Sequence, residues 1–341
     1  TRSLGHRHGR QRLTQRRQGN FVASLHRRRE GRLHLLLHRG VAHGVKGTRW
    51  GRMSDVLGAI GDLVDDIVVR LLEPVNQASD TRSIVLRRRG GSAANVVEAA
   101  CRAGHRARFI GQVGDDATGR WLTDQLAELG AEVAVRRSGR TGSIVVLLST
   151  DGERTMLTDR GACTELDHPD PMWLEGLHTL HIPYYSLVGE PLAGTTVSLA
   201  HLANRRNISV SVDVSSVAVI RSRGTQQVMA DITALHPTVV LANELEADEL
   251  GALLTPANVG GATVVVKRGP LAAVVVQADG STTEVAAEAL QHVVDTTGAG
   301  DAFAAGLLIA RAEGATWEGA VAAAHRTAAD AIRRASAAAM D

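Results

Sequence analysis

The sequence predicts an α/β fold in which a central, mostly parallel β-sheet is covered by helices on both faces. Short apolar runs alternate with helical stretches from residue 53 onward, and such alternation produces right-handed βαβ units that build a parallel sheet. The runs are rich in Val, Leu and Ile, as expected for strands buried on both faces. Two β-like runs around Asp151-Gly152 form a hairpin signal and predict a small β lid over one end of the sheet.

Each element follows from a local pattern. The predicted strands are residues 55–60, 108–110, 143–148, 154–157, 179–182, 208–214, 239–242, 263–266, 272–276 and 293–294. The predicted helices are residues 94–102, 120–129, 192–203, 226–235, 244–250, 299–312 and 316–335. Gly104 and Gly130 end the first two helices, because glycine readily adopts the left-handed conformation that follows a helix. Residues 61–66 are predicted as a turn and Asp279-Gly280 as the turn of a second hairpin. The small β structure is assigned to segments near 67–90 and 136–160.

Bulk composition indicates a globular protein with an aliphatic core. The chain has 341 residues, of which 44% are hydrophobic, 22% are charged and only 3% are aromatic, so Val, Leu, Ile and Ala must fill the core. Cys101 and Cys163 are the only cysteines; two cannot form a disulfide framework, which favours a reducing, cytoplasmic compartment. No apolar run reaches the roughly 18 residues that span a bilayer, so no membrane partner is expected.

Positive charge is concentrated in the N-terminal segment 1–52. This segment has 14 Lys and Arg residues and one acidic residue, which gives +13, whereas the remainder has 24 basic and 35 acidic residues, or −11. Its composition, rich in Arg, His, Gly and Gln, is not expected to fold. It could be a nucleic-acid-binding arm, a targeting peptide or upstream sequence outside the natural protein. The third interpretation is favoured because Met53 stands just before the first convincing strand, so residues 53–341 are taken as the folded domain.

The most informative segment is Asp295-Thr296-Thr297-Gly298-Ala299-Gly300-Asp301, between a predicted strand and an Ala-rich helix. Its glycines allow backbone N–H groups to converge on an anion, and the helix dipole adds to that preference. A carboxylate at Asp301 would repel a phosphate unless it takes a proton from the attacking hydroxyl, which is general-base chemistry. The alternative is structural: a glycine-rich turn, then an Asp that favours the first helical turn. The sequence contains no G-x-x-x-x-G-K-[ST] loop and no dinucleotide-binding glycine fingerprint.

Further segments lie where predicted strands and helices meet. Asn243-Glu244-Leu245-Glu246 is either part of a site or simply a helix N-cap with a capping-box acid. Lys267 is one of only two lysines in the chain, and it either contacts a phosphate or is a solvated strand end. In Gly90-Gly91-Ser92-Ala93-Ala94-Asn95, the glycines let the backbone approach a polyol, and the Asn amide can donate to one hydroxyl and accept from another.

These segments resemble the signatures of ribokinase-like carbohydrate kinases, the PfkB family. Residues 295–301 closely match the family pattern D-T-x-G-A-G-D, and the layout from about residue 54 to the C-terminus is similar to that of the family. The resemblance implies a ribokinase-like, three-layer α/β/α fold with a small β lid, and ATP and Mg²⁺ as cofactors. It also implies that Asp301 is the catalytic base and that the backbone of Gly298, Ala299 and Gly300 forms an anion hole.

The resemblance extends to nucleotide and metal residues. Asn243 and Glu246 match the N-x-x-E motif, in which the glutamate holds the Mg²⁺ shell through water and the asparagine lies near the phosphates. Lys267 and Gly269 match the segment where the family backbone approaches ATP. Some relatives carry a monovalent cation bound by the residues equivalent to Asp295 and Thr297, but the sequence does not decide whether K⁺ is required.

On the acceptor side, the resemblance implies a set of sugar ligands. Gly90, Gly91 and Asn95 match the pattern G-G-x-x-x-N. Asp66 matches the acidic residue that accepts hydrogen bonds from sugar hydroxyls, although the adjacent Asp65 could take that place. Four more candidates for contacting an acidic or polar substrate, as in 2-keto-3-deoxygluconate kinases, are Arg154, Arg160, Tyr184 and Tyr185.

The expected function is therefore ATP-dependent phosphorylation of a hydroxyl on a sugar or sugar acid. A nucleoside acceptor is an alternative that the scarcity of aromatic residues disfavours, and a phosphosugar would need a cationic cluster that the sequence does not reveal. A catalytically silent binding protein on the same fold is a second alternative, against which the intact Asp301 argues. Relatives often dimerise through their lids, so the resemblance is compatible with a homodimer, but the sequence does not decide the oligomeric state. Nucleic acid is not an expected partner.

Overall fold

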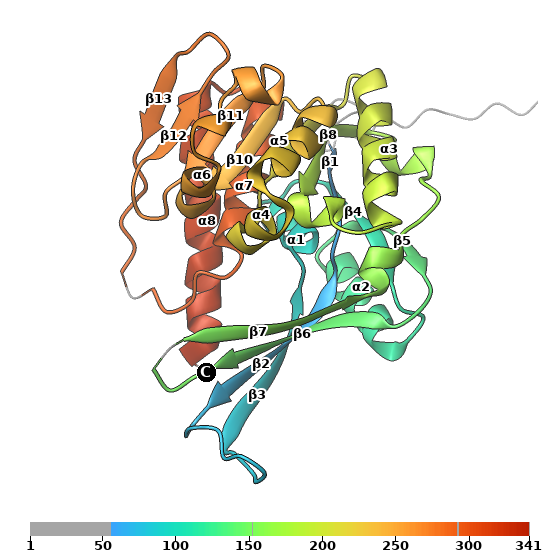
Figure 1. Ribbon diagram of the computed structural model, residues 1–341, viewed down its shortest axis with the longest axis vertical. Coiled ribbons are helices and arrows are strands. Elements are labelled where there is room, and N and C mark those ends of the chain that lie inside the picture. The colour runs from blue at the N-terminus through green and yellow to red at the C-terminus, as the bar shows by residue number, and fades with distance from the viewer. Residues whose placement is uncertain (1–55, 152, 292, 341) are drawn as a thin grey trace, which may run out of the picture. The chain divides into compact units, whose positions relative to one another are not determined.

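A nine-stranded, mostly parallel sheet forms the centre of the fold (Figure 1). The computed structural model describes residues 56–340 except 152 and 292, and for 337–340 it describes only the backbone. In spatial order the strands are β13 (Thr282–Val285), β12 (Ala273–Val276), β11 (Thr263–Lys267), β10 (Val239–Asn243), β9 (Ser209–Asp213), β8 (Leu177–Pro183), β1 (Val56–Ile60), β4 (Ala107–Val113) and β5 (Glu132–Arg137). Neighbours from β11 to β5 are parallel, whereas β12 and β13 extend the sheet as an antiparallel hairpin.

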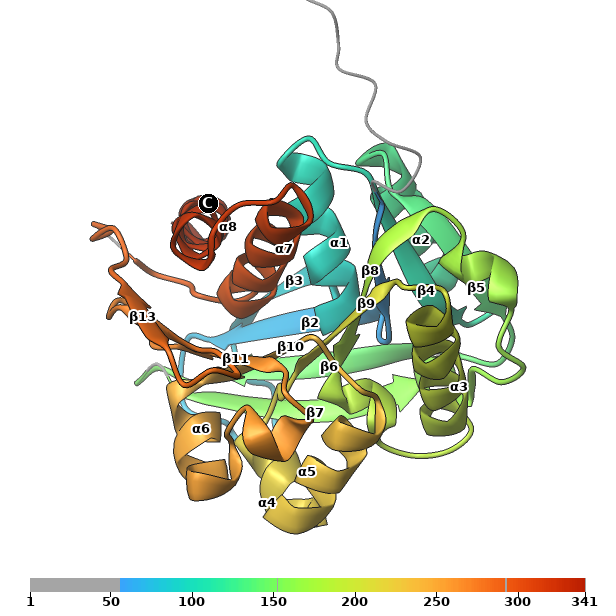
Figure 2. The same ribbon diagram turned by 90° about the horizontal axis from the view of Figure 1, so that it is seen from above.

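Two helical layers cover the sheet, as Figure 2 shows. One layer contains α1 (Ser92–Arg102), α2 (Ala117–Glu128), α7 (Ala299–Ala312) and α8 (Trp317–Met340), and the other contains α3 (Leu192–Arg205), α4 (Val217–Arg223), α5 (Thr225–Ala234) and α6 (Glu244–Leu250). Each layer encloses a hydrophobic core against one face of the sheet. Successive side chains of a strand point to opposite faces, so Leu241 packs under the layer of α1, α2, α7 and α8, whereas its neighbours Val240 and Ala242 pack under the layer of α3 to α6. The predicted three-layer α/β/α architecture is confirmed.

A separate four-stranded sheet forms the lid. Its strands are, in order, β3 (Ser83–Gly90), β2 (Val64–Leu71), β6 (Thr141–Leu148) and β7 (Arg154–Gly161). Strand β2 follows β1 after a short turn, and β3 leads directly into α1. The lid is therefore attached at the edge of the central sheet where β1 ends, and its two outer strands are β3 and β7.

Several local predictions need correction. Residues 293–294 are not a strand: Val293 and Val294 are 46% and 53% exposed and lie after β13, which already ends the sheet. The predicted turn at 61–66 is shorter, because β2 begins at Val64 and pairs with β3 along its length. Strand β5 and helix α4 were not predicted, and the last helix continues beyond residue 335 to Met340.

The interpretations of residues 1–52 lie outside the described residues. Within the described part of the chain, no helix combines the length and the apolar character that crossing a membrane requires.

Candidate active site

Three neighbouring parallel strands end in polar residues at one edge of the central sheet. Asp213 is the last residue of β9, Asn243 of β10 and Lys267 of β11. Ligands of open α/β sheets bind beyond the carboxyl ends of the strands, so this edge is the expected site. Asp213 was not singled out from the sequence, although an Asp that ends the apolar run of β9 was an available signal.

The first turn of α7 faces the same edge. Gly298 precedes the helix in the left-handed conformation, with φ 76° and ψ 0°, which glycine adopts without steric cost. The Lys267 ammonium lies 3.4 Å from the position that a Cβ on Gly300 would occupy. The Ala299 N–H donates to the carbonyl of Thr296 (3.1 Å), whereas the Gly300 N–H has no backbone acceptor in the described part of the chain. An unpaired N–H at a helix start beside an ammonium group suits a phosphate.

The Asp301 carboxylate lies in this first turn and contacts α1. Ser92 Oγ donates to Oδ1 (2.6 Å) and Asn95 Nδ2 donates to Oδ2 (2.9 Å). Burial raises the pKa of Asp301 to about 6; Asp213 adds to the rise, and the two hydrogen bonds and Lys267 oppose it. At neutral pH the group is mostly ionised and still basic enough to accept a proton. Ser92 was missed in the sequence, where a hydroxyl directly after Gly91 was the signal.

Asn95 links Asp301 to a buried arginine. Its Oδ1 accepts a hydrogen bond from Arg89 Nη1 (3.2 Å), so both ends of the amide are engaged within the protein. The Arg89 side chain is 6% exposed and also pairs with Glu98. Burial lowers the pKa of Arg89 to about 10, and the nearby carboxylates of Asp301 and Asp66 oppose this effect. Arg89, which the sequence analysis overlooked, thus lies between the two carboxylates predicted as base and acceptor ligand.

Asp66 and Asp65 have different surroundings. Asp65 accepts a hydrogen bond from Arg87 Nη2 (2.7 Å). Oδ1 of Asp66, in contrast, is buried and has no hydrogen-bond partner in the described part of the chain, and burial raises the pKa of Asp66 to about 6. Because a buried carboxylate without donors is costly, the hydroxyls of a ligand would supply what Asp66 lacks.

Close approach explains the two glycines beside Asp66. A Cβ on Gly90 would lie 2.3 Å from the Asp66 carboxylate, and a Cβ on Gly91 would lie 2.2 Å from the carbonyl oxygen of Asp62. Gly91 also has a φ of 101°, which other residues rarely adopt. A cavity of about 720 Å³ lies nearby; Asp66, Asn95 and Gly298 line it, whereas the two glycines and Asp301 do not.

Asn243 and Glu246 form a capping box at the start of α6. Asn243 Oδ1 accepts the Glu246 N–H (2.9 Å), while Glu246 accepts the Asn243 N–H (2.8 Å) and the Asn243 side-chain amide (2.7 Å). The structural interpretation of this motif therefore holds. Glu246 is nevertheless unusual, because it is only 2% exposed and burial together with repulsion from Asp213 raises its pKa to about 7.

Lys267 balances the negative charge of this cluster. Its Nζ donates to Asp213 Oδ2 (2.5 Å), and its side chain is 12% exposed, so it is not a solvated strand end. Burial alone would lower the pKa of Lys267, but Asp213, Glu246 and Asp301 together raise it. The ammonium group therefore stays charged among three carboxylates.

The donor set around Lys267 fits a magnesium ion held through water. Asp213 and Glu246 place two carboxylates near one ammonium, and Mg²⁺ favours such oxygen ligands together with water and substrate phosphates. No group of three or more His, Cys, Asp or Glu side chains that could bind a metal directly occurs among the residues the structure describes.

A second cavity, of about 530 Å³, adjoins this cluster. Among the predicted residues, Asn243, Lys267, Gly269, Ala299 and Gly300 all line it. The rest of its lining includes the apolar side chains of Val293, Leu290, Phe303, Ala328, Ala329 and Ile332. Val293 thus lines a cavity instead of extending the sheet, and the cavity extends from apolar side chains to the start of α7.

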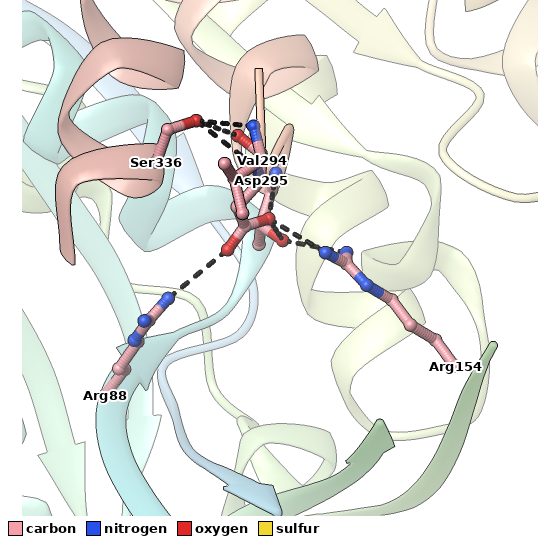
Figure 3. Close-up of polar contacts among 6 residues, drawn as sticks. Arg88, Arg154, Val294, Asp295 and Ser336 are labelled. Atoms are coloured by element: carbon pink, nitrogen blue, oxygen red, sulfur yellow. Dashed lines mark hydrogen bonds and ion pairs between the residues drawn. The ribbon is translucent and has the colours of Figure 1, made fainter. Parts of the chain in front are cut away.

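Asp295 lies beside the anion-binding loop but contacts arginines of the lid (Figure 3). Arg154 Nη2 donates to Oδ1 (3.0 Å) and Arg88 Nη1 donates to Oδ2 (3.3 Å). Thr297 donates to Oδ1 from both its N–H (2.9 Å) and its hydroxyl (2.6 Å). Asp295 and Thr297 are the two residues predicted to hold a monovalent cation. The Asp295 carboxylate is hydrogen-bonded to Thr297 and to the guanidinium groups of Arg88 and Arg154.

The remaining candidates for substrate contact make contacts within the protein. Arg160 pairs with both carboxylate oxygens of Asp62 (2.8 Å each) and also donates to the carbonyl of Tyr185 (3.0 Å). The hydroxyl of the fully buried Tyr184 donates to Asp231 (2.6 Å), on α5. Tyr184 therefore supports the core behind the sheet.

Comparisons with known proteins bear on the family and the fold. The chain matches the model of the pfkB family carbohydrate kinases over residues 58–341. A fructokinase from Klebsiella pneumoniae is 30% identical over 273 residues, which cover 75% of this chain and 84% of the relative. An aminoimidazole riboside kinase from Salmonella typhimurium is 27% identical over 77% of this chain and 84% of the relative. The crystal structure of adenosine kinase from Sinorhizobium meliloti aligns with a TM-score of 0.69 at 23% identity, over 83% of this chain and 100% of that one, and supports the fold.

Proposed function

The chain belongs to the PfkB family of carbohydrate kinases, and on this premise we propose that it phosphorylates a sugar hydroxyl with ATP, using Asp301 as the general base. The observation that carries the proposal is the position of the Asp301 carboxylate. It is partly buried in the first turn of α7, directly after the 298–300 loop, and accepts a hydrogen bond from Asn95 on the acceptor side. A carboxylate placed there would oppose phosphate binding unless it serves as a base.

Each group then has its own task in the transfer. Asp301 takes the proton of the acceptor hydroxyl as the hydroxyl oxygen bonds to the γ-phosphorus. The bond from that phosphorus to the bridging oxygen breaks, and ADP leaves. Lys267 and the Gly300 N–H face the charge that spreads over the phosphoryl oxygens. Glu246 and Asp213, with Asn243 beside them, would hold Mg²⁺ through its water shell, and the ion supplies charge neutralisation along the phosphates.

The 530 Å³ cavity and the surroundings of Asp66 suit the two substrates. The apolar lining of the 530 Å³ cavity would receive the adenine ring, with Gly269 and Lys267 leading toward the phosphates. On the other side of Asp301, the unpaired oxygen of Asp66 and the bare backbone of Gly90 favour an acceptor with several hydroxyls. A sugar or sugar acid is therefore the proposed acceptor class, in line with the fructokinase relative.

A panel of acceptors tests the proposal. ADP release from MgATP is measured with pentoses, hexoses, keto-deoxy sugar acids and nucleosides. We expect one strong acceptor among the sugars or sugar acids. A strong nucleoside acceptor would instead support the alternative suggested by the riboside kinase relative. MgATP binding without turnover of any acceptor would point to a silent binding protein.

We infer in addition that the lid forms a dimer interface. Its outer strands β3 and β7 carry the exposed apolar side chains of Ile84, Val85, Met156 and Leu157, each between 42% and 60% exposed. Exposed apolar patches of this kind are typical of protein interfaces, and unpaired edge strands add free backbone groups. Sedimentation velocity should show a dimer that Val85→Glu and Met156→Glu together convert to monomer. A wild-type protein that sediments as a monomer would contradict the inference.

A further inference from the structure

Two arginines of the lid meet on one carboxylate beside the anion-binding loop (Figure 3). Arg154 comes from β7 and Arg88 from β3, the two outer strands of the lid. Arg154 also donates to the Thr297 hydroxyl (3.1 Å). The contact thus joins both edges of the lid to the residues that directly precede Gly298.

The backbone that carries this carboxylate is hydrogen-bonded to α8. Asp295 is 8% exposed, and Ser336 Oγ, on α8, accepts hydrogen bonds from the N–H groups of Val294 (3.0 Å) and Asp295 (3.2 Å). The arginines therefore attach the lid to a fixed point of the body. Arg88 is moreover the cross-strand partner of Asp66, so the acceptor ligand and the lid contact occupy opposing positions of one strand pair.

The cation that the family resemblance implies does not fit these contacts. Oδ1 of Asp295 already accepts hydrogen bonds from Arg154 and from both donors of Thr297, and Oδ2 accepts one from Arg88. Although burial alone would raise the pKa of Asp295, the Thr297 hydrogen bonds and Arg154 hold it below its usual range. One negative charge thus faces two guanidinium groups, so a further cation at this carboxylate would be repelled.

We propose that Arg88 and Arg154 form a latch that closes the lid on Asp295 and takes the place of a monovalent cation beside the anion hole. The inference rests on the proposed kinase function for its catalytic consequence, but the contacts of the latch involve protein side chains alone. When the lid closes, two positive charges arrive next to the loop that binds the transferring phosphoryl group. Lid closure and completion of the anion site are then one event, and neither requires K⁺.

Salt substitution tests the cation half of the proposal. The melting temperature and the turnover rate are measured in KCl, NaCl and choline chloride at one ionic strength, so that general screening is constant. We expect the wild-type rates to agree within about twofold, because two guanidinium groups already neutralise Asp295. A K⁺-specific rise in melting temperature, or activation by K⁺ of about tenfold or more, would overturn the proposal, because the carboxylate would then bind the ion.

Hydrogen exchange tests the latch half. Arg88→Gln and Arg154→Gln, made together, should speed amide exchange in β3 and β7 of the substrate-free protein by about tenfold or more, since each lost charged hydrogen bond lowers the cost of opening. Arg82→Gln is the matched control, because Arg82 also belongs to the lid but pairs with Glu73, at 76% exposure. Unchanged exchange in the double variant would overturn the proposal. The exchange and melting measurements need no acceptor. They therefore test the latch even if no acceptor is phosphorylated and the proposed kinase function is wrong.

Discussion

Asp301→Asn should lower turnover by roughly 10³-fold without weakening MgATP binding, because it removes the base together with a negative charge that opposes the phosphates. Asparagine has the shape of aspartate, and it can accept from Asn95 Nδ2 and donate to Ser92 Oγ, the two groups that hold Asp301 now. ADP release with the best acceptor measures the first quantity, and calorimetric titration with MgATP measures the second. A variant that keeps its activity would place the base elsewhere.

The same substitution should not destabilise the protein. The pKa of Asp301 is raised from 3.8 to about 6 by burial, so the folded state binds this proton more tightly than the unfolded state does. The associated stability is complete below the unfolded pKa and is lost as the pH rises through about 6; at neutral pH the ionised group costs up to about 3 kcal/mol. Asp279→Asn, in the exposed turn between β12 and β13, is the matched control and should change neither stability nor rate.

The pH dependence of the wild-type rate at low pH is an independent test of Asp301 as the base. Protonated Asp301 cannot accept the hydroxyl proton, so kcat/KM should fall as the pH drops below about 6. Asp66 has a pKa raised into the same range, and its protonation would also weaken acceptor binding. We therefore expect the slope of log kcat/KM against pH to exceed the value for a single protonation. Asp66→Asn should return the slope to that of a single protonation.

The parts of the site that follow from local chemistry could be predicted from the sequence. The 298–301 turn and the strand ends at Asn243 and Lys267 were recognisable, because glycines and apolar runs act over a few residues. The contact of Ser92 with Asp301 joins positions 209 residues apart, and it depends on how α1 and α7 pack. No pattern along the chain reports such packing.

The lid marks the limit of prediction from sequence in another way. Arg154 and Asp295 are 141 residues apart, and their meeting depends on the register of four strands and on where the lid sits. Asp295 could therefore be assigned only by resemblance, as a cation ligand. Val293 and Val294 show a second limit, in which a local preference is misleading. Their β-branched side chains predict a strand, but the sequence does not show whether a neighbouring strand is available for pairing.

Lys267→Met should destabilise the protein by about 3–5 kcal/mol at neutral pH, because it leaves buried carboxylates without their cation. Lys267 donates to Asp213 and lies within electrostatic reach of Glu246 and Asp301. Methionine keeps the length and the apolar stem of the side chain and removes only the charge. Chemical denaturation at several pH values measures the loss.

The pH dependence distinguishes charge from packing as the cause. Without Lys267 the pKa values of Glu246 and Asp301 should rise further, so these two carboxylates bind protons more tightly when folded than when unfolded. The deficit should therefore shrink as the pH is lowered toward 5, and Asp213→Asn added to Lys267→Met should recover part of it at neutral pH. A deficit that is the same at every pH would mean that Lys267 acts through packing. Lys267 also faces the phosphoryl site. If Asp213→Asn restores the stability of Lys267→Met but not its turnover, the structural role of Lys267 is distinct from its catalytic role.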